Sequence, residues 1–197
     1  MGRRRFNGIA DNDVPSGQPL SCAREKDLNE PALKIEVVSR IEAGEILCSP
    51  QRCAEIAYLI SIGDGGDPLP EGFENIERKS RLMIADVVTE EGATEEDVRG
   101  IIHLAKQLQS QDGVLLVHCE AGISRSTAVA LIINACWLGP GFEDEAMRRV
   151  IEQRPYALPN PRIVALADRI LGLGGRLLQA RNDHMLPGDY FDYTDDH

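Results

Sequence analysis

The chain has 197 residues, 43% hydrophobic and 27% charged, a composition typical of a single globular domain with a sizeable core. Its net charge of −11 at pH 7 argues against nucleic acid or an anionic membrane surface as the main partner. No apolar run approaches the roughly 20 residues that span a bilayer, so no membrane contact is expected.

The cysteines suggest a reducing compartment. They are odd in number and lack the spacing of metal ligands: Cys22, Cys48, Cys53, Cys119 and Cys136. With no secretory signal at the start of the chain, reduced thiols and a cytoplasmic location are expected. We expect neither a metal site nor a cofactor.

Composition divides the chain into three segments. Residues 1–30 mix Arg, Gly, Pro, Asn and Asp without apolar periodicity, which predicts a flexible N-terminal tail. The folded domain is expected over residues 31–175. Residues 176–197, which end in acidic and aromatic side chains, are expected to form a C-terminal tail.

Strand and helix patterns alternate along the folded domain. Alternating or apolar segments predict strands over residues 33–38, 57–62, 81–88 and 114–117. Helices are predicted over residues 40–47, from Ser49-Pro50, from Thr94 to about Ser110, and over residues 126–138, 143–153 and 161–171. This alternation predicts an α/β fold with a central, largely parallel sheet flanked by helices.

The most informative stretch runs over residues 114–138. Four apolar residues after a turn predict a buried strand, and residues 126–138 have helical spacing. A small-residue loop joins the two. Such a loop directs backbone N–H groups and the positive end of the helix dipole at one point, which predicts an oxyanion site.

Cys119 lies at the mouth of this loop and Arg125 closes it. A helix N-terminus and a cationic neighbour lower the pKa of a thiol, so Cys119 is a candidate nucleophile. The planar guanidinium of Arg125 can hold two phosphate oxygens, which lysine cannot imitate. Ser126 can donate its hydroxyl to the sulfur, and Gly122 allows a turn that a Cβ would obstruct.

The string HCEAGISRST, from His118 to Thr127, matches the signature HC-x5-R-[ST]. The chain thereby resembles the cysteine-dependent protein tyrosine phosphatase superfamily, in its dual-specificity and bacterial tyrosine-phosphatase-like branch, over roughly residues 33–175. The resemblance implies a phosphate-binding loop between a central strand and a helix, and a phosphocysteine mechanism without metal. Phosphate would bind to the backbone of Glu120, Ala121, Gly122, Ile123, Ser124 and Arg125.

In the resembled family a general acid lies on a loop some thirty residues before the cysteine. Asp86 lies thirty-three before Cys119 and is our candidate to protonate the leaving oxygen. It is predicted at the carboxyl end of a strand, where α/β enzymes place their chemistry. The alternative is that Asp86 only ends the strand or caps a turn. Glu90 and Glu91 are rival acids.

Two further side chains are candidate supports, together with Ser126. Adjacent residues at a strand end point to opposite sides, so His118 is expected to face away from the phosphate and hydrogen-bond the loop backbone. By resemblance Asn160 supports the catalytic loop from behind. From the residues alone, Asn160 is a helix cap before Pro161 at the first helical position.

The predicted function is that of a protein phosphatase that hydrolyses phosphotyrosine. Whether it also hydrolyses phosphoserine and phosphothreonine depends on the depth of the cleft. The loop has no lysine, and Glu120 would repel a polyanion, so a single phosphate ester on a protein is favoured over a phosphoinositide. One alternative is a phosphopeptide-binding pseudophosphatase. Another is a thiolate-based sulfur- or arsenate-handling enzyme, which would need a resolving cysteine such as Cys48 or Cys53.

Overall fold

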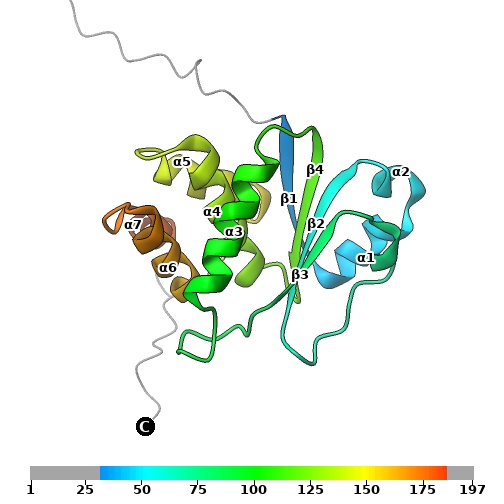
Figure 1. Cartoon of the computed structure of the whole chain (residues 1–197), viewed down its shortest axis with the longest axis horizontal. Coiled ribbons are helices and arrows are strands. Elements are labelled where there is room, and N and C mark those ends of the chain that lie inside the picture. The colour runs from blue at the N-terminus through cyan, green and yellow to red at the C-terminus, as the bar shows by residue number, and fades with distance from the viewer. Residues whose placement is uncertain (1–31, 186–197) are drawn as a thin grey trace, which may run out of the picture.

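The computed structural model describes residues 32–185, in which one four-stranded sheet lies between two layers of helices (Figure 1). The strands are β1 (Leu33–Ser39), β2 (Ile56–Gly63), β3 (Lys79–Met83) and β4 (Gly113–Cys119). Their order is β1-β4-β2-β3, and every neighbouring pair is parallel. The predicted α/β fold with a parallel sheet is therefore confirmed.

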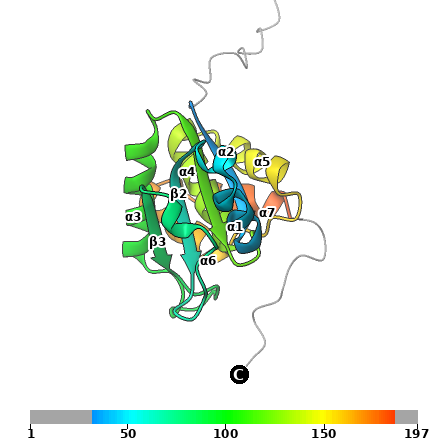
Figure 2. The same ribbon diagram turned by 90° about the vertical axis from the view of Figure 1, so that its right-hand side faces the viewer.

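The helices are divided unequally between the two faces of the sheet, as Figures 1 and 2 show. One face carries the helices α1 (Arg40–Cys48) and α2 (Pro50–Cys53), with the short helix η1 (Phe73–Asn75). The other face carries α3 (Glu95–Leu108), α4 (Arg125–Leu138), α5 (Glu143–Gln153), α6 (Pro161–Leu171) and α7 (Arg176–Asp183). The larger core therefore lies on the side of α4.

The most buried strand runs directly into the most buried helix. In β4, Leu115, Leu116 and Val117 have no exposed surface, because β1 and β2 flank the strand and helices cover both faces. In α4, buried residues run from Arg125 to Ala135 without a break. Apolar residues all round a helix predict such complete burial. The loop between these elements is thus held by the rigid centre of the molecule.

The predicted strand over residues 81–88 is wrong at its carboxyl end. Strand β3 ends at Met83, and the Ile84 N–H donates the next hydrogen bond to Gly63 O at 3.0 Å. Because β2 also ends at Gly63, the chain beyond Ile84 has no ladder to join. Ile84 is apolar because it is buried in the core, 1% exposed, after the strand has ended.

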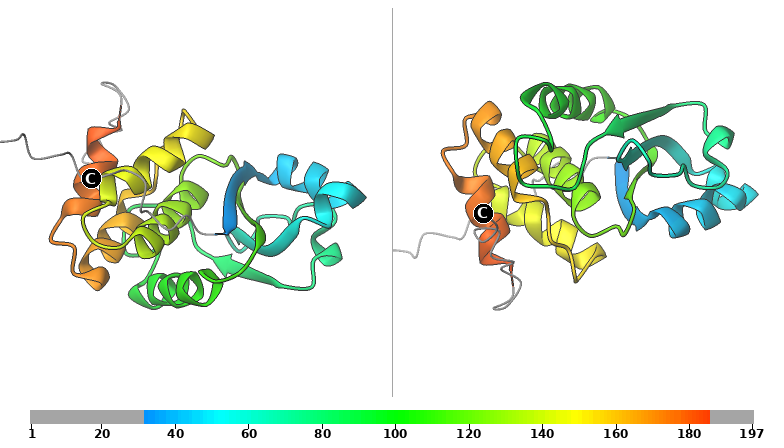
Figure 3. Two further views of the ribbon diagram at one scale, coloured as in Figure 1. Left: turned by 90° about the horizontal axis from the view of Figure 1, so that it is seen from above. Right: turned by 90° about the horizontal axis from the view of Figure 1, so that it is seen from below.

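The predicted boundary of the folded domain at residue 175 is also wrong, because α7 continues the fold to Asp183. The buried carboxylate of Asp168 accepts hydrogen bonds from the N–H groups of Gly175 and Leu177, at 2.6 and 2.7 Å. Leu177 is fully buried, so α7 packs beside α5 and α6 (Figure 3). The predicted tails over residues 1–30 and 186–197 lie outside the described residues.

None of the helices in residues 32–185 is long and apolar enough to cross a membrane.

Candidate active site

Three loops meet at the carboxyl edge of the sheet, at the lower end of the view in Figure 1. They follow β2, β3 and β4, and the last of them leads into the N-terminus of α4. In open α/β sheets, ligands bind at the carboxyl ends of the strands. We call the loop of residues 120–124 the anion loop and the loop of residues 84–94 the acid loop.

Outward-facing carbonyl groups hold the anion loop. Glu120 O accepts from Arg40 N at 3.1 Å, Ile123 O from Leu158 N at 2.9 Å, and Ser124 O from Asn160 N at 3.3 Å. In a planar trans peptide the N–H of the following residue points the opposite way from the carbonyl. These bonds therefore turn N–H groups toward the inside of the loop, as an oxyanion site requires.

Gly122 lets the anion loop lie directly against β1. Its φ is +73°, a left-handed conformation that favours glycine. A Cβ at this position would come within 2.7 Å of Val38 C and 2.8 Å of Ser39 N, which are backbone atoms. The predicted need for glycine at this turn is confirmed.

Cys119 ends β4 beneath the anion loop and is 2% exposed. Its Sγ lies 3.2 Å from Ser126 Oγ in the first turn of α4. A hydroxyl that donates to sulfur favours the thiolate over the thiol. The structure thus places Cys119 and Ser126 together as the sequence predicted.

Arg125 is buried, 6% exposed, although it is charged. Its Nη1 donates to Ile84 O at 3.1 Å and to Asp67 Oδ2 at 3.2 Å. Its Nε is buried and donates no hydrogen bond within residues 32–185; the nearest carboxylate oxygen, Asp86 Oδ2, is 3.5 Å away. A buried donor without an acceptor is costly, and a bound anion would satisfy it.

Asp86 lies on the acid loop, three residues after β3 ends, and faces the anion loop. Its Oδ1 accepts from Ser124 Oγ at 2.6 Å and from Asn160 Nδ2 at 2.9 Å. The rival acids Glu90 and Glu91 are exposed, and neither has a hydrogen bond or ion pair with another described residue. Of the three candidates, the structure brings only Asp86 to the site.

Asn160 combines both interpretations that the sequence left open. Its Oδ1 accepts from the N–H groups of Arg162 and Ile163 and so caps α6. Its Nδ2 donates to Asp86 Oδ1, and its backbone N–H donates to Ser124 O. The helix cap therefore fixes the amide that holds Asp86.

The ring of His118 is buried, 1% exposed, and its Nδ1 donates to Cys119 O at 3.2 Å. Burial lowers the pKa of this imidazole to about 4, so the ring is neutral at neutral pH. The predicted hydrogen bond to the loop backbone is confirmed.

Comparison of the sequence with known proteins finds phosphatases that resemble part of this chain. No family model matches the chain. The chain is 30% identical to mouse Dual specificity protein phosphatase 15 over 107 residues, which are 54% of this chain and 43% of that protein. The human protein of the same name is 31% identical over 107 residues, 34% of its length. The chain is thus similar to dual-specificity protein phosphatases over about half of its length.

Solved structures share the fold of this chain. Human DUSP28 matches with a TM-score of 0.53 at 19% identity, over 72% of this chain and 92% of that chain. A human tyrosine phosphatase-like serine/threonine/tyrosine-interacting protein matches with a TM-score of 0.55 at 22% identity, over 73% and 93%. The matched part of the curated relatives is less than half of their length.

Three charged residues at the phosphatase-like site were missed in the sequence: Arg40, Asp67 and Arg81. Arg40 Nε and Nη2 donate to the two carboxylate oxygens of Glu120, at 2.7 and 3.1 Å. This pairing lowers the pKa of Glu120 and offsets its charge, which weakens the predicted repulsion of polyanions. Of the three residues, only Asp67 lay in a segment that the sequence marked, the turn Asp64–Pro68, and a turn alone does not indicate a role at the site.

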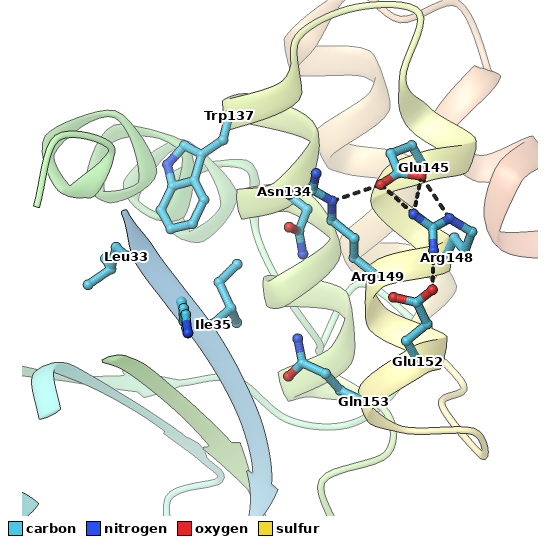
Figure 4. A pocket seen from close by; sticks show the side chains of 10 residues that line it. Leu33, Ile35, Asn134, Trp137, Glu145, Arg148, Arg149, Glu152 and Gln153 are labelled. Atoms are coloured by element: carbon cyan, nitrogen blue, oxygen red, sulfur yellow. Dashed lines mark hydrogen bonds and ion pairs between the residues drawn. The ribbon is translucent and has the colours of Figure 1, made fainter. Parts of the chain in front are cut away.

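A separate pocket of about 360 Å³ lies between β1, α4 and α5 (Figure 4). Arg148 and Arg149 line it, and both pair with Glu145, while Arg148 also pairs with Glu152. The positive charge of this pocket is therefore already neutralised. At the anion loop, Arg125 also pairs with carboxylates, Asp67 and Asp86, but its buried Nε still lacks a hydrogen bond.

Proposed function

We propose that the chain is a metal-independent protein phosphatase that hydrolyses phosphotyrosine, and also phosphoserine or phosphothreonine, through a phosphocysteine intermediate. The observation that carries this proposal is the pair of Cys119 and Arg125. A buried sulfur lies beside a hydroxyl at the base of the anion loop, and a buried guanidinium whose Nε lacks a hydrogen bond closes the same loop. The similarity to mouse Dual specificity protein phosphatase 15 supports the proposal.

In the first step the Cys119 thiolate forms a bond to phosphorus while the bond to the leaving oxygen breaks. The three equatorial oxygens accept from the inward N–H groups of residues 120–125 and from Arg125. Asp86, as the carboxylic acid, gives its proton to the leaving oxygen, so that a neutral alcohol or phenol departs.

In the second step water attacks phosphorus and the bond to Cys119 Sγ breaks. Asp86, now a carboxylate, takes the proton from the water as it attacks. The Ser126 hydroxyl, 3.2 Å from the sulfur, donates to the departing thiolate. Inorganic phosphate leaves, and the starting protonation states are restored.

The contacts of Asp86 fit a group that meets the substrate. Asn160 and Ser124 hold its Oδ1, while its Oδ2 lies 3.5 Å from Arg125 Nε. A phosphate oxygen bound to Nε would replace Asp86 Oδ2 as the nearest anion. Asp86 Oδ2 would then face the bound ester, where its proton is needed.

Substrate class and location follow from the same reasoning. The curated relatives are dual-specificity protein phosphatases by name, which supports a phosphoprotein substrate for a phosphatase domain that includes residues 32–185. Cys48, Cys53, Cys119 and Cys136 are all free thiols, which supports a reducing compartment such as the cytoplasm. Cys48 lies at the far end of α1, about 12 Å along the helix from Arg40, which does not favour it as a resolving partner of Cys119.

Hydrolysis of p-nitrophenyl phosphate with a metal chelator present tests the proposal. We expect chelator-resistant turnover in the wild type and in Cys48→Ser, a matched control that removes an exposed thiol. In Cys119→Ser, turnover should fall by more than about a thousandfold, because the nucleophile is lost. Phosphotyrosine and phosphothreonine peptides then define the specificity. A folded wild type that binds such peptides without hydrolysing them would instead be a binding module.

A further inference from the structure

The loop that follows β2 carries a carboxylate that the proposed mechanism does not use. We propose that Asp67 is a positioning residue: it holds one side of the Arg125 guanidinium so that the opposite edge faces the phosphate. This inference rests on the proposed function, because it concerns how the same anion site is built. In this role Asp67 orients Arg125 and does not itself contact the reacting atoms.

The contacts of Arg125 divide its guanidinium into two sides. Nη1 is occupied twice, by Ile84 O at 3.1 Å and by Asp67 Oδ2 at 3.2 Å. Nε has no hydrogen bond within the described residues, and neither has Nη2. Nε and Nη2 form one edge of the planar fork, which matches two phosphate oxygens. Asp67 therefore binds the guanidinium where it leaves that edge available.

Asp67 is itself held by hydrogen bonds from its own loop and from Arg81 on β3. Its Oδ2 also accepts from Asp64 N at 2.8 Å, and its backbone carbonyl accepts from Arg81 Nη2 at 3.1 Å. Arg81 Nη1 donates to Ser61 Oγ at 2.9 Å, and Ser61 has no exposed surface. The position of Asp67 is thus set by a buried residue of β2 through one rigid arginine.

Gly63 makes room for this arrangement. A Cβ at Gly63 would lie 2.1 Å from Arg81 Nη2 and 2.6 Å from its Cζ. The guanidinium of Arg81 therefore occupies the space that a side chain at Gly63 would take, and a larger residue there would displace it. Gly63, Arg81 and Asp67 form a continuous support that ends at Arg125.

Because Asp67 is charged, the two possible roles of this residue predict opposite changes in phosphate affinity when it is removed. The hydrogen bond from Asp64 N, and then the Arg125 guanidinium, hold the pKa of Asp67 below its ordinary value. The carboxylate is therefore ionised near neutral pH, and its charge opposes a phosphate dianion. If Asp67 only competed with phosphate for Arg125, its removal would tighten phosphate binding. If Asp67 positions Arg125, its removal should weaken phosphate binding.

The experiment compares Asp67→Ala, Asp67→Asn and Asp64→Asn with the wild type. It measures kcat and KM for p-nitrophenyl phosphate and the dissociation constant of inorganic phosphate by calorimetry. We expect Asp67→Ala to lower kcat by about 10- to 100-fold, as a misplaced binding group does, and to weaken phosphate binding. Asp67→Asn keeps an acceptor for Nη1 and should recover most of kcat. Asp64→Asn removes the same charge nearby, keeps the backbone N–H, and should stay within about twofold.

Tighter phosphate binding in Asp67→Ala with unchanged kcat would overturn the inference, and so would the absence of any difference. If Asp67→Ala does not fold, phosphate affinity decides: phosphate binding that is tighter in Asp67→Asn than in Asp64→Asn would overturn the inference. A wild type that binds phosphate but has no turnover would refute the proposed function alone, and the phosphate affinities of the variants would still decide. A folded wild type that does not bind phosphate would refute both.

Discussion

The anion loop and the acid loop face each other across the site but are held in opposite ways. Three carbonyls of the anion loop accept backbone N–H groups from two other segments, and Gly122 lets the loop lie against β1. The donors that bind the acid loop at the site are side chains: Arg125 binds Ile84 O, and Ser124 and Asn160 both bind Asp86, whose side chain is 34% exposed. The anion loop is thus held by backbone donors, and the acid loop is held at the site by side-chain donors.

This difference suits the two proposed roles. A site for an oxyanion stabilises charge best when its donors need no rearrangement during the reaction. A general acid must reach the leaving oxygen of different substrates, and a loop held by a few side-chain bonds can adjust at little cost. Changes in the anion loop should therefore lower both stability and activity, whereas changes in the acid loop should lower activity alone.

The largest effect is expected from Arg125→Lys. The charge remains, but the fork that binds two phosphate oxygens and the contacts to Ile84 and Asp67 are lost. Loss of one such preorganised donor lowers kcat by about 100- to 1,000-fold. Steady-state kinetics with p-nitrophenyl phosphate measures this.

Arg148→Lys is the matched control for that substitution. Arg148 lies in the pocket of Figure 4, where it pairs with Glu145 and Glu152 on the surface. Its kinetics should equal those of the wild type. If both variants lost activity equally, the fork of Arg125 would have no special role.

The next largest effect is expected from Asp86→Asn. The amide keeps an acceptor for Ser124 and Asn160, so the acid loop should stay in place and stability should not change. Loss of a general acid costs about 100-fold or more in kcat. The decline in rate toward high pH, where the wild-type acid is deprotonated, should disappear. The deficit should be larger for phenyl phosphate than for p-nitrophenyl phosphate, whose leaving group needs less protonation.

Glu90→Gln and Glu91→Gln serve as controls, since both residues lie on the same loop. Each should retain wild-type kinetics and the full pH profile. A loss of the high-pH decline in either variant, with an unchanged profile in Asp86→Asn, would transfer the role of general acid.

The anion loop was predictable from sequence because its parts are contiguous. The strand, the loop with Cys119 and Arg125, and the helix follow one another, so local spacing alone orders them. The placement of Asp86 was harder, because the apolar residues after Met83 imitate a longer strand. Its choice as the candidate acid depended on a family resemblance, and its contact with Ser124 joins residues that are 38 positions apart.

Contacts between segments far apart in the chain could not be predicted from the sequence. Asp67 meets Arg125 across 58 positions, and Arg154 binds Glu42 across 112. Neither pair has a local pattern, since each depends on which loops the sheet order brings together. The helix α7 was missed for a different reason. Its sequence is mainly polar, and the caps from Asp168 that hold it come from another helix.

A third prediction tests the rigidity of the anion loop through His118. Its pKa is about 4 in the folded state against 6.5 in the unfolded chain, so between these values the unfolded chain binds a proton that the fold does not. Stability should therefore fall as pH drops from 6.5 to 4, by up to about 3 kcal/mol. Urea unfolding at several pH values measures this loss.

His118→Gln should lack this term, whereas His103→Gln, which removes an exposed histidine on α3, should keep it. The window is distinct from that of Glu42, because Arg154 lowers the pKa of Glu42 to about 2. That carboxylate contributes stability that is lost only as pH falls from 4.5 toward 2. If wild type and His118→Gln lost stability in parallel above pH 4, the ring would not be buried as a neutral group.

The smallest effect is expected from Gly122→Ala. This substitution separates the cost of close packing from the cost of backbone conformation alone. The substitution adds a Cβ at a φ of +73°, where it meets the backbone of Val38 at 2.7 Å. Gly172→Ala is the matched control: its φ is +68° at the end of α6, and a Cβ there meets nothing within 4 Å. Conformational strain alone should cost about 1 kcal/mol in the control. Gly122→Ala should cost about 2–3 kcal/mol and also lower kcat, since the loop must move to admit the methyl group. Equal costs in chemical denaturation, with unchanged kcat, would mean that the anion loop yields as easily as an exposed turn.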